Sequence, residues 1–215
     1  MTTVEPIYVQ YGCGLCAPRG WLNFDSSPSL RLSRLPVLGR AFGGAIPRFP
    51  ASVRHGDIVR GLPVTGGSCS GVYASHVLEH LSLFDARTAL ANTLKILKPG
   101  GVFRLLVPDL ELLARDYLGC SETDAALRFM ERSMLGRVER ARSPLSRLRE
   151  AIGSGNHLWM WDQKSLVAEC EHAGFDRVRR CAFGDADDPA FAAVEDPGRF
   201  DGAVAIEARR PGGLP

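Results

Sequence analysis

The chain has 215 residues, a formal net charge of +2 at pH 7, 45% hydrophobic residues and 23% charged residues. This length is enough for one α/β domain with a sizeable core, and a charge so close to zero gives no strong field for nucleic acid or a membrane surface. No apolar run reaches the roughly 18 residues of a membrane span, and the N-terminus lacks the basic and apolar regions of a signal peptide. Six scattered cysteines indicate reduced thiols. We therefore expect a cytoplasmic protein that binds neither nucleic acid nor membranes, with residues 1–215 forming a single domain.

The first third of the chain predicts three short strands. Residues 7–11 and 21–24 are rich in aromatic and branched side chains, which favour strands, and residues 52–55 form a weaker third candidate. Residues 26–50 combine proline, glycine, serine and arginine, so we expect them to be irregular. Because only residues 12–20 separate the first two strands, their connection must be tight and must lack a full helix.

The middle of the chain predicts a βαβ unit. Residues 71–74 are a short apolar run, followed by two helical segments. The second of these, up to residue 97, carries one apolar stripe at helical spacing. Residues 98–101, Lys-Pro-Gly-Gly, end that helix, because they place a cation, a proline and flexible glycines at its negative end. Residues 102–107 are a second apolar run, and such runs are typical of a parallel sheet covered on both faces.

The last half of the chain predicts helices and then two strands. Residues 109–155 are mainly helical and rich in arginine. Asp162 is a candidate N-cap for a further helix. Residues 178–183 and 203–208 are the last two strands, and the acidic, proline-containing segment 184–200 between them reads as a loop. Without a helix between them, these two strands would pair antiparallel at the edge of the sheet.

A glycine turn and an acid follow the first two predicted strands. The first strand ends in Gly12-Cys13-Gly14 and the second ends in Asp25. Ligands of open α/β sheets lie beyond the carboxyl ends of the strands, where glycines let a ligand approach backbone N–H groups; a simple structural turn is the alternative. Together with Ala17 the glycines satisfy the dinucleotide fingerprint, but Pro18, Gly20 and Trp21 follow almost at once and leave no room for the required helix. Asp25 also comes too early for the acid of that fingerprint. The pattern therefore argues against NAD or FAD.

The exact residues at 71–109 indicate a family more specifically than their hydrophobic periodicity does. A strand followed by SHVLEHL, a helix and LKPGGVFRLLVPD resembles the middle of class I S-adenosylmethionine (SAM) dependent methyltransferases, in particular a compact bacterial subgroup of the type 11 kind. The resemblance implies a Rossmann-like, mostly parallel seven-stranded sheet with an antiparallel last strand, here with a shortened first crossover. It also implies SAM as the cofactor. The residues that it places around SAM are Tyr11, Gly12, Cys13, Gly14, Asp25, Ser26, Asp57, Ile58, Ser75 and His76.

The resemblance assigns roles to some of these residues. Asp25 would accept hydrogen bonds from the ribose hydroxyls, Asp57 would meet the adenine amino group, and Ile58 would pack on the adenine ring. Ser75 and His76 would lie beside the transferred methyl group, which makes His76 a candidate general base, because histidine titrates near neutral pH. Two features depart from the family pattern: the short first crossover, and a glutamine at position 10 where many relatives have an acid.

Several histidines and cysteines could instead suggest a metal. His76, Glu79 and His80 would share one helical face and match the inverted zinc-protease motif H-x-x-E-H, so a divalent ion or a zinc hydrolase are alternatives. We expect a role in the SAM pocket and in helix packing, because the zinc-protease motif needs a long helix and a further acidic ligand. Cys13 and Cys16 have no second cysteine pair to complete a structural zinc site. The expectation is therefore that no metal is bound.

The segment at about 110–161 is expected to form a helical, arginine-rich cap over the open side of the pocket. From Arg128 to Glu150 it has seven Arg and three Glu, 7 − 3 = +4, which suggests an anionic acceptor. A merely solvated arginine face is the alternative and has the greater weight. The resemblance also covers His157, Trp159 and Trp161, with His157 as a second candidate base and the two tryptophans as walls of the acceptor site. A capped loop with buried aromatic side chains is the alternative.

These observations predict methyl transfer from SAM to an oxygen or nitrogen of a small molecule, a glycan or another natural product. A non-catalytic ligand-binding protein on a degenerate methyltransferase fold is the alternative, motivated by the missing helix and the glutamine. The sequence is compatible with a homodimer and does not identify the acceptor.

Overall fold

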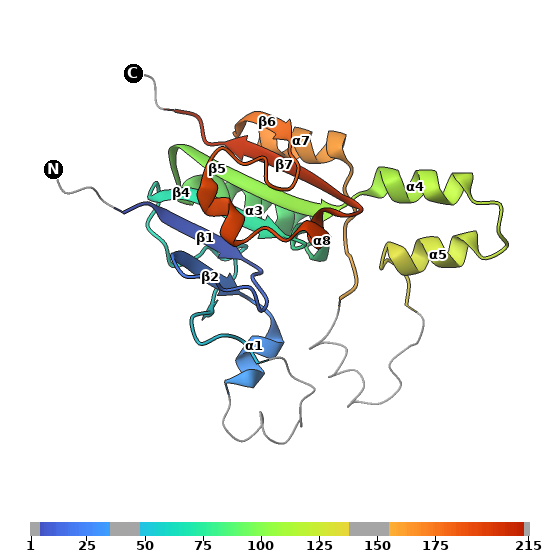
Figure 1. Ribbon diagram of the computed structural model, residues 1–215, viewed down its shortest axis with the longest axis horizontal. Helices are drawn as coiled ribbons and strands as arrows, with labels where there is room; N and C mark the ends of the chain where they lie inside the picture. Colours follow the sequence, from blue (N-terminus) through green and yellow to red (C-terminus); the bar gives the residue numbers. More distant parts are fainter. Residues whose placement is uncertain (1–4, 35–47, 138–154, 213–215) are drawn as a thin grey trace.

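The computed structural model describes residues 5–34, 48–137 and 155–212, and its strands form one seven-stranded sheet in the order β3-β2-β1-β4-β5-β7-β6 (Figure 1). The strands are β1 (Ile7–Tyr11), β2 (Trp21–Asp25), β3 (Arg54–His55), β4 (Cys69–Ser75), β5 (Leu97–Pro108), β6 (Asp176–Arg180) and β7 (Ala203–Arg209). Neighbouring strands are parallel except where β7 pairs antiparallel with β5 and β6. The predicted Rossmann-like sheet with one antiparallel strand is confirmed.

Three short helices lie where the sequence predicted irregular chain. The helical elements are α1 (Pro28–Ser33), η1 (Leu78–His80), α3 (Leu83–Ile96), α4 (Leu110–Gly119), α5 (Ala125–Arg132), α7 (Gln163–His172), η2 (Pro189–Ala193) and α8 (Pro197–Phe200). The prediction was wrong for α1, η2 and α8, and the three share one cause. Each begins with a capping Ser or Asp followed by proline, at Ser27, Asp188 and Asp196. The cap satisfies a free backbone N–H, and proline fixes the helical φ at a position whose N–H would have no partner.

One face of the sheet is covered by α3 and α7 (Figure 1). The stripe of α3 that faces the sheet consists of Ala86, Ala89, Leu90, Thr93 and Ile96, at the spacing of a helix with one buried side. The helix begins at the N-cap Ser82, ends at Ile96 before the predicted Pro-Gly-Gly turn, and is followed directly by β5. Asp162 caps α7 as predicted, with a capping box that it shares with Ser165.

The opposite face is covered by the segment that contains η2. Phe191 is fully buried there, and its ring contacts the rings of Tyr8, Trp21 and Tyr73 at centroid distances of 6.5, 5.6 and 6.5 Å. A Cβ at Gly71 would lie 2.9 Å from the rings of both Phe191 and Tyr8, so glycine is required at this crowded position. This segment therefore fills the space over β1 and β2 where a crossover helix is absent.

A buried polar network holds the short connection between β1 and β2. Gln10 is 3% exposed, and its side-chain amide donates to the carbonyl of Cys16 at 2.5 Å and to Oδ1 of Asn23 at 2.7 Å. Asn23 in turn donates to the carbonyls of Pro18 and Trp21 at 3.1 and 3.0 Å. These bonds satisfy backbone carbonyls that a helix would otherwise satisfy by itself. The glutamine that departs from the family pattern therefore has a structural role in this connection.

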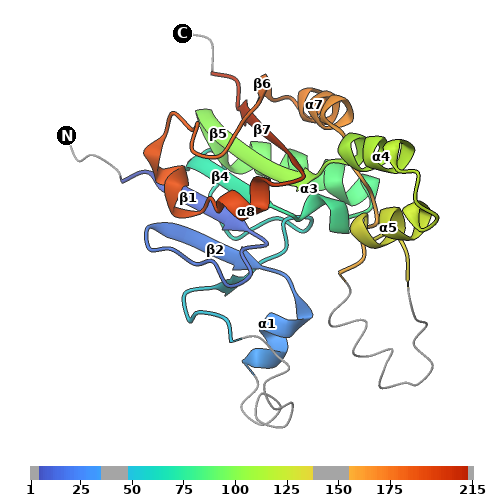
Figure 2. The same ribbon diagram turned by 45° about the vertical axis from the view of Figure 1, so that its right-hand side comes forward.

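The helices α4 and α5 form a hairpin that projects from the end of the sheet (Figures 1 and 2). No residue of α5 is buried, and α4 buries only Leu113. Of the predicted cap at about 110–161, residues 138–154 lie outside the described part of the chain. The two described helices of this segment project beside the sheet. No helix among the described residues is long and apolar enough to cross a membrane.

Candidate active site

The carboxyl ends of β1 and β2 meet at one edge of the sheet, where the glycine turn contacts Asp25. The Asp25 carboxylate is 6% exposed; its Oδ2 accepts the backbone N–H of Gly14 at 2.9 Å, and its Oδ1 accepts that of Ser27 at 2.7 Å. A carboxylate has about four lone-pair positions, so two remain for further donors. The predicted pairing of turn and acid is therefore present, and the acid also stabilises the turn.

The two glycines of the turn differ in what surrounds them. Gly12 has a φ of +64°, and a Cβ there would lie 2.3 Å from Cγ2 of Val77, so the turn packs directly against the chain after β4. Gly14 has a φ of +53°, and nothing lies within 4 Å of the position that its Cβ would occupy. Positive φ values favour glycine at both positions. The backbone of Gly14 is therefore open on its Cβ side, beside a buried carboxylate.

Three of the residues expected around SAM have their side chains in the core. Tyr11 is 2% exposed, its hydroxyl accepts a hydrogen bond from Thr93 at 3.2 Å, and burial raises its pKa. Ile58 is 4% exposed and belongs to the main hydrophobic cluster. Cys13 is 5% exposed, and burial together with the nearby Asp25 carboxylate raises the pKa of its thiol to about 12. Their side chains are therefore part of the buried core and are not exposed to a ligand.

Two further predicted residues are accessible at the same edge. Asp57 is half-buried; its Oδ1 accepts the backbone N–H of Val59 at 2.9 Å, and its Oδ2 lies 3.5 Å from Nε of Arg60. Ser26 is exposed directly after β2. At this edge Gly14, Ser26 and Asp57 are thus at least partly exposed, and the buried Asp25 carboxylate lies beside Gly14.

The end of β4 holds His76 in an unusual conformation. Its φ is +55°, a strained region that non-glycine residues rarely adopt and that is concentrated at functional sites. The ring lies between two acceptors: Nε2 is 3.0 Å from the carbonyl of Arg199, and Nδ1 is 3.3 Å from Oε1 of Glu79. Burial alone would lower the pKa of His76, but these two acceptors outweigh it and raise the pKa. Ser75 precedes it and is buried at 8% exposure.

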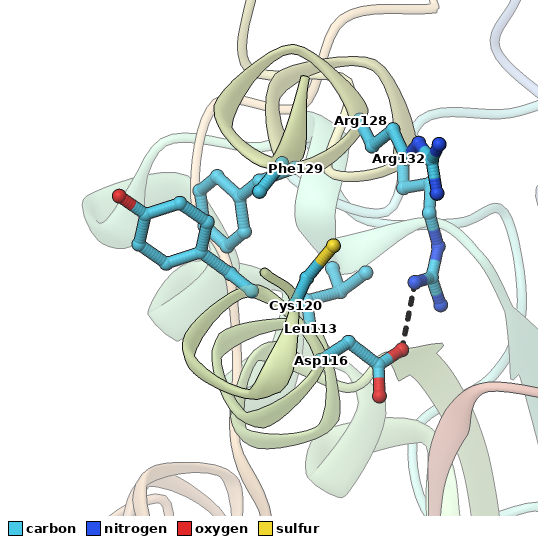
Figure 3. A pocket seen from close by; sticks show the side chains of 8 residues that line it. Leu113, Asp116, Cys120, Arg128, Phe129 and Arg132 are labelled. Carbon is cyan, nitrogen blue, oxygen red and sulfur yellow. Dashed lines mark hydrogen bonds and ion pairs between the residues drawn. The ribbon is translucent and has the colours of Figure 1, made fainter. Parts of the chain in front are cut away.

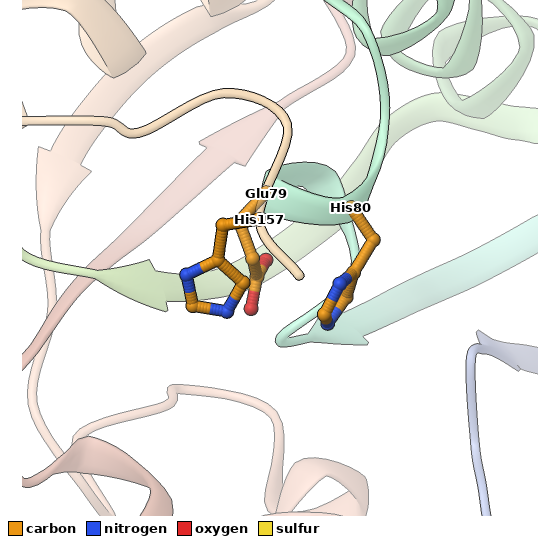
Figure 4. Close-up of side chains that lie close together, drawn as sticks. All are labelled: Glu79, His80 and His157. Atoms are coloured by element: carbon orange, nitrogen blue, oxygen red, sulfur yellow. The ribbon is translucent and has the colours of Figure 1, made fainter. Parts of the chain in front are cut away.

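The expected helical face through His76, Glu79 and His80 is not formed. Because His76 has a positive φ, no helix can include it, and only residues 78–80 form a single turn of 3₁₀ helix. The long helix that a zinc-protease motif needs is therefore absent from this described stretch. Instead, Glu79 and His80 lie beside His157, and one ligand atom from each of the three lies within 4.8 Å of the others (Figure 4).

The segment around His157 is split between core and surface. His157 is 8% exposed and its ring centroid is 5.0 Å from that of His80; burial lowers its pKa, an effect that the Glu79 carboxylate partly offsets. Trp161 is 1% exposed and lies in the main hydrophobic cluster, so the prediction that it forms a wall of the acceptor site is wrong. Trp159 is 42% exposed, which leaves its ring available to a ligand.

The α4–α5 hairpin encloses a small pocket of about 170 Å³ (Figure 3). This volume is below the roughly 300–1,000 Å³ of sites for drug-sized ligands. Its arginines are paired: Arg128 with Asp124 at 2.8 Å and Arg132 with Asp116 at 2.7 Å. In this described part of the cap, the charges of Arg128 and Arg132 are balanced by nearby aspartates, so they give no support to an anionic acceptor.

Comparisons with known proteins agree with this geometry. The family model of the methyltransferase domain matches residues 11–105. A SAM-dependent methyltransferase of Thermotoga maritima has a similar fold, with 18% identity, a TM-score of 0.51, and coverage of 97% of this chain and 84% of that one. The methyltransferase solved with the Haloferax volcanii Trm112 methyltransferase activator shows 17% identity and a TM-score of 0.49 over 96% of this chain and 83% of its own. The chain covers 49% of the CurJ carbon methyltransferase, at 12% identity and a TM-score of 0.49. No curated protein matches the sequence.

The matched region runs from the glycine turn through most of β5, and so includes the turn, the acid after β2 and the end of β4. The sheet has the seven strands and the single antiparallel strand that the resemblance implied. Residues 11–105 therefore match the methyltransferase domain, and the chain has the fold of class I SAM-dependent methyltransferases.

Proposed function

We propose that the protein transfers the methyl group of SAM to an oxygen or nitrogen of a small molecule, a glycan or another natural product. The observation that carries this proposal is the buried Asp25 carboxylate, which lies beside the open backbone of Gly14 at the carboxyl edge of the sheet. We propose further that residues 1–215 act as one cytoplasmic domain, without nucleic acid or a membrane as partner. A homodimer remains compatible with this function.

When bound, SAM would supply an electrophilic methyl group on a sulfonium. The chain would contribute mainly alignment, and positioning of two reactants can supply roughly 7–11 kcal/mol of barrier reduction. Asp25 would bind the ribose hydroxyls through its free lone pairs, and Asp57 would meet the adenine amino group. Trp159 would offer an exposed aromatic surface to the acceptor.

An acceptor with an OH or NH group must also lose a proton. We propose His76 for this role, since it follows β4 at the same edge and keeps 26% of its side chain exposed. His157, the other candidate base, is 8% exposed and has less access to an acceptor. Replacing His76 with Gln is expected to lower kcat while SAM affinity stays within about twofold. A normal kcat in this variant would remove His76 as the base.

The ribose assignment is tested by replacing Asp25 with Asn, which keeps the shape but removes the charge. A charge-assisted hydrogen bond contributes about 1.5–3 kcal/mol, so we expect SAM affinity to fall about 10-fold to 150-fold in isothermal titration calorimetry. Asp201→Asn, a change of the same kind in an exposed turn, serves as the control. Circular dichroism checks that both variants fold. Unchanged affinity in a folded Asp25→Asn protein would refute the assignment.

The acceptor is sought by incubating the protein with radiolabelled SAM and a panel of hydroxylated and amine-bearing small molecules, glycans and phosphorylated sugars. Release of the demethylated product that depends on one acceptor, and that is lost in the Asp25→Asn variant, would identify the substrate class. No turnover with any member, although SAM binds, would contradict the proposed range of acceptors.

A further inference from the structure

Glu79 is fully buried, yet its carboxylate lacks hydrogen bonds. Within the described part of the chain, neither Oε1 nor Oε2 has a hydrogen-bond partner, and the same is true of Nδ1 of the buried His157. Leaving a buried polar group unsatisfied costs about 1–3 kcal/mol, and more for a charged group. The neighbouring His76 ring, 3.3 Å from Oε1, balances part of the charge but leaves Oε2 without a partner. An ordered water or a bound ion would satisfy such a cluster.

The backbone holds this cluster in place. The N–H groups of Leu158 and Trp159 both donate to the Glu79 carbonyl, at 2.7 and 3.2 Å, and the N–H of His157 donates to the carbonyl of Met134 at 3.1 Å. These bonds tie the segment before α7 to the turn after β4, although the two lie far apart in the sequence. The cluster is therefore built into the fold and does not depend on flexible surface side chains.

A hydrogen bond also orients the His80 ring. Nδ1 of His80 is 3.3 Å from the carbonyl of Asn156. Because a carbonyl can only accept, Nδ1 must carry the proton, which leaves Nε2 with a free lone pair in the neutral ring. Histidines that bind metals use this arrangement, in which one nitrogen donates to a carbonyl and the other binds the ion.

We propose that Glu79, His80 and His157 bind a divalent transition-metal ion such as Zn²⁺. Two imidazoles and one carboxylate form a donor set that is common for such ions, whereas Mg²⁺ and Ca²⁺ prefer oxygen donors alone. The three ligand atoms lie within 4.8 Å of one another, and metal–ligand bonds of about 2.1 Å would draw them to roughly 3.4 Å apart. His76 would then contact the coordinating carboxylate from outside. This inference reverses the expectation from sequence that no metal is bound.

The site would be incomplete as a structural zinc site. Structural sites usually have four protein ligands, whereas three ligands leave a position for water or another small molecule. Glu79 and His80 lie in the short segment that follows β4. The free coordination position of the ion would therefore lie near the end of that strand. The proposal concerns metal binding and stands whether or not methyl transfer needs the ion.

The test measures metal on untagged protein that has been treated with a chelator, reloaded with Zn²⁺ and passed through a desalting column. We expect about one Zn²⁺ per chain by elemental analysis, and visible d–d absorption when Co²⁺ replaces Zn²⁺. Replacing His80, the least buried of the three, with Asn should weaken Zn²⁺ at least about 100-fold, since loss of a supporting contact alone costs 10–100-fold. Glu79→Gln and His157→Asn should do the same.

His172→Asn and Cys16→Ser, which change exposed residues elsewhere, are the controls and should bind Zn²⁺ as the wild type does. Circular dichroism and SAM affinity in each variant separate loss of metal from loss of fold. If Glu79→Gln or His157→Asn does not fold, the proposal is tested by Zn²⁺ binding of His80→Asn together with the Co²⁺ spectrum of the wild type. Less than stoichiometric metal on the wild type, or undiminished Zn²⁺ binding by folded His80→Asn, would overturn the proposal.

Discussion

Replacing Phe191 with Ala tests whether the segment around η2 covers the face of the sheet that a crossover helix between β1 and β2 would otherwise cover. The Phe191 ring is fully buried, contacts three aromatic rings, and has the guanidinium of Arg104 5.7 Å from its centroid. Truncating a buried phenylalanine costs about 3–5 kcal/mol. For a domain of this size, each kcal/mol lowers the melting temperature by about 2–4 °C. We therefore expect the melting temperature to fall by about 6–20 °C.

The free energy of unfolding is measured by urea denaturation followed by tryptophan fluorescence and circular dichroism. Phe191→Leu keeps most of the apolar volume and should cost less than about 1.5 kcal/mol. Phe84→Ala, at a side chain that is 78% exposed, should change stability by no more than about 0.5 kcal/mol. A loss below about 1 kcal/mol for Phe191→Ala would show that η2 is not needed to cover this face of the sheet.

Two further predictions concern the turn and a helix cap. In urea denaturation Gly12→Ala should cost clearly more stability than Gly14→Ala, because a Cβ at Gly12 would overlap the Val77 side chain, whereas Gly14→Ala should cost only the roughly 1–2 kcal/mol of a positive φ. Equal losses of stability in the two variants would contradict the geometry. Asp162→Ala should cost about 1 kcal/mol near neutral pH, because the Asp162 carboxylate caps α7. Hydrogen bonds from Ser165 lower the pKa of Asp162 in the folded state, so this contribution is present above its unfolded pKa of about 4 and should be lost as the pH falls through the folded value. A cost for Asp162→Ala that does not shrink in acid would show that the charge of the cap is irrelevant.

Much of the fold could be predicted because its signals are local. Alternating or continuous apolar runs gave the positions of the strands, and Asp162 was identified as an N-cap from its place before a helical stripe. The glycine turn and Asp25 were expected together because the carboxyl ends of neighbouring parallel strands lie at one edge of a sheet. The three short helices were missed although each carries a capping residue followed by proline. That signal is readable in the sequence when the proline is treated as the first residue of a helix and not as a residue that ends one.

The sequence by itself therefore determined the main strands, the helices α3 and α7 and the residues of the glycine turn, since these depend on neighbours a few positions away. Only the tertiary structure decided that Gln10 holds the short crossover, that Phe191 covers the opposite face, and that Trp161 lies in the core. It alone placed His157 beside Glu79 and His80, and it broke the expected helical face at His76. Contacts of this kind depend on how distant segments pack, and they cannot be predicted from the spacing of residues along one segment.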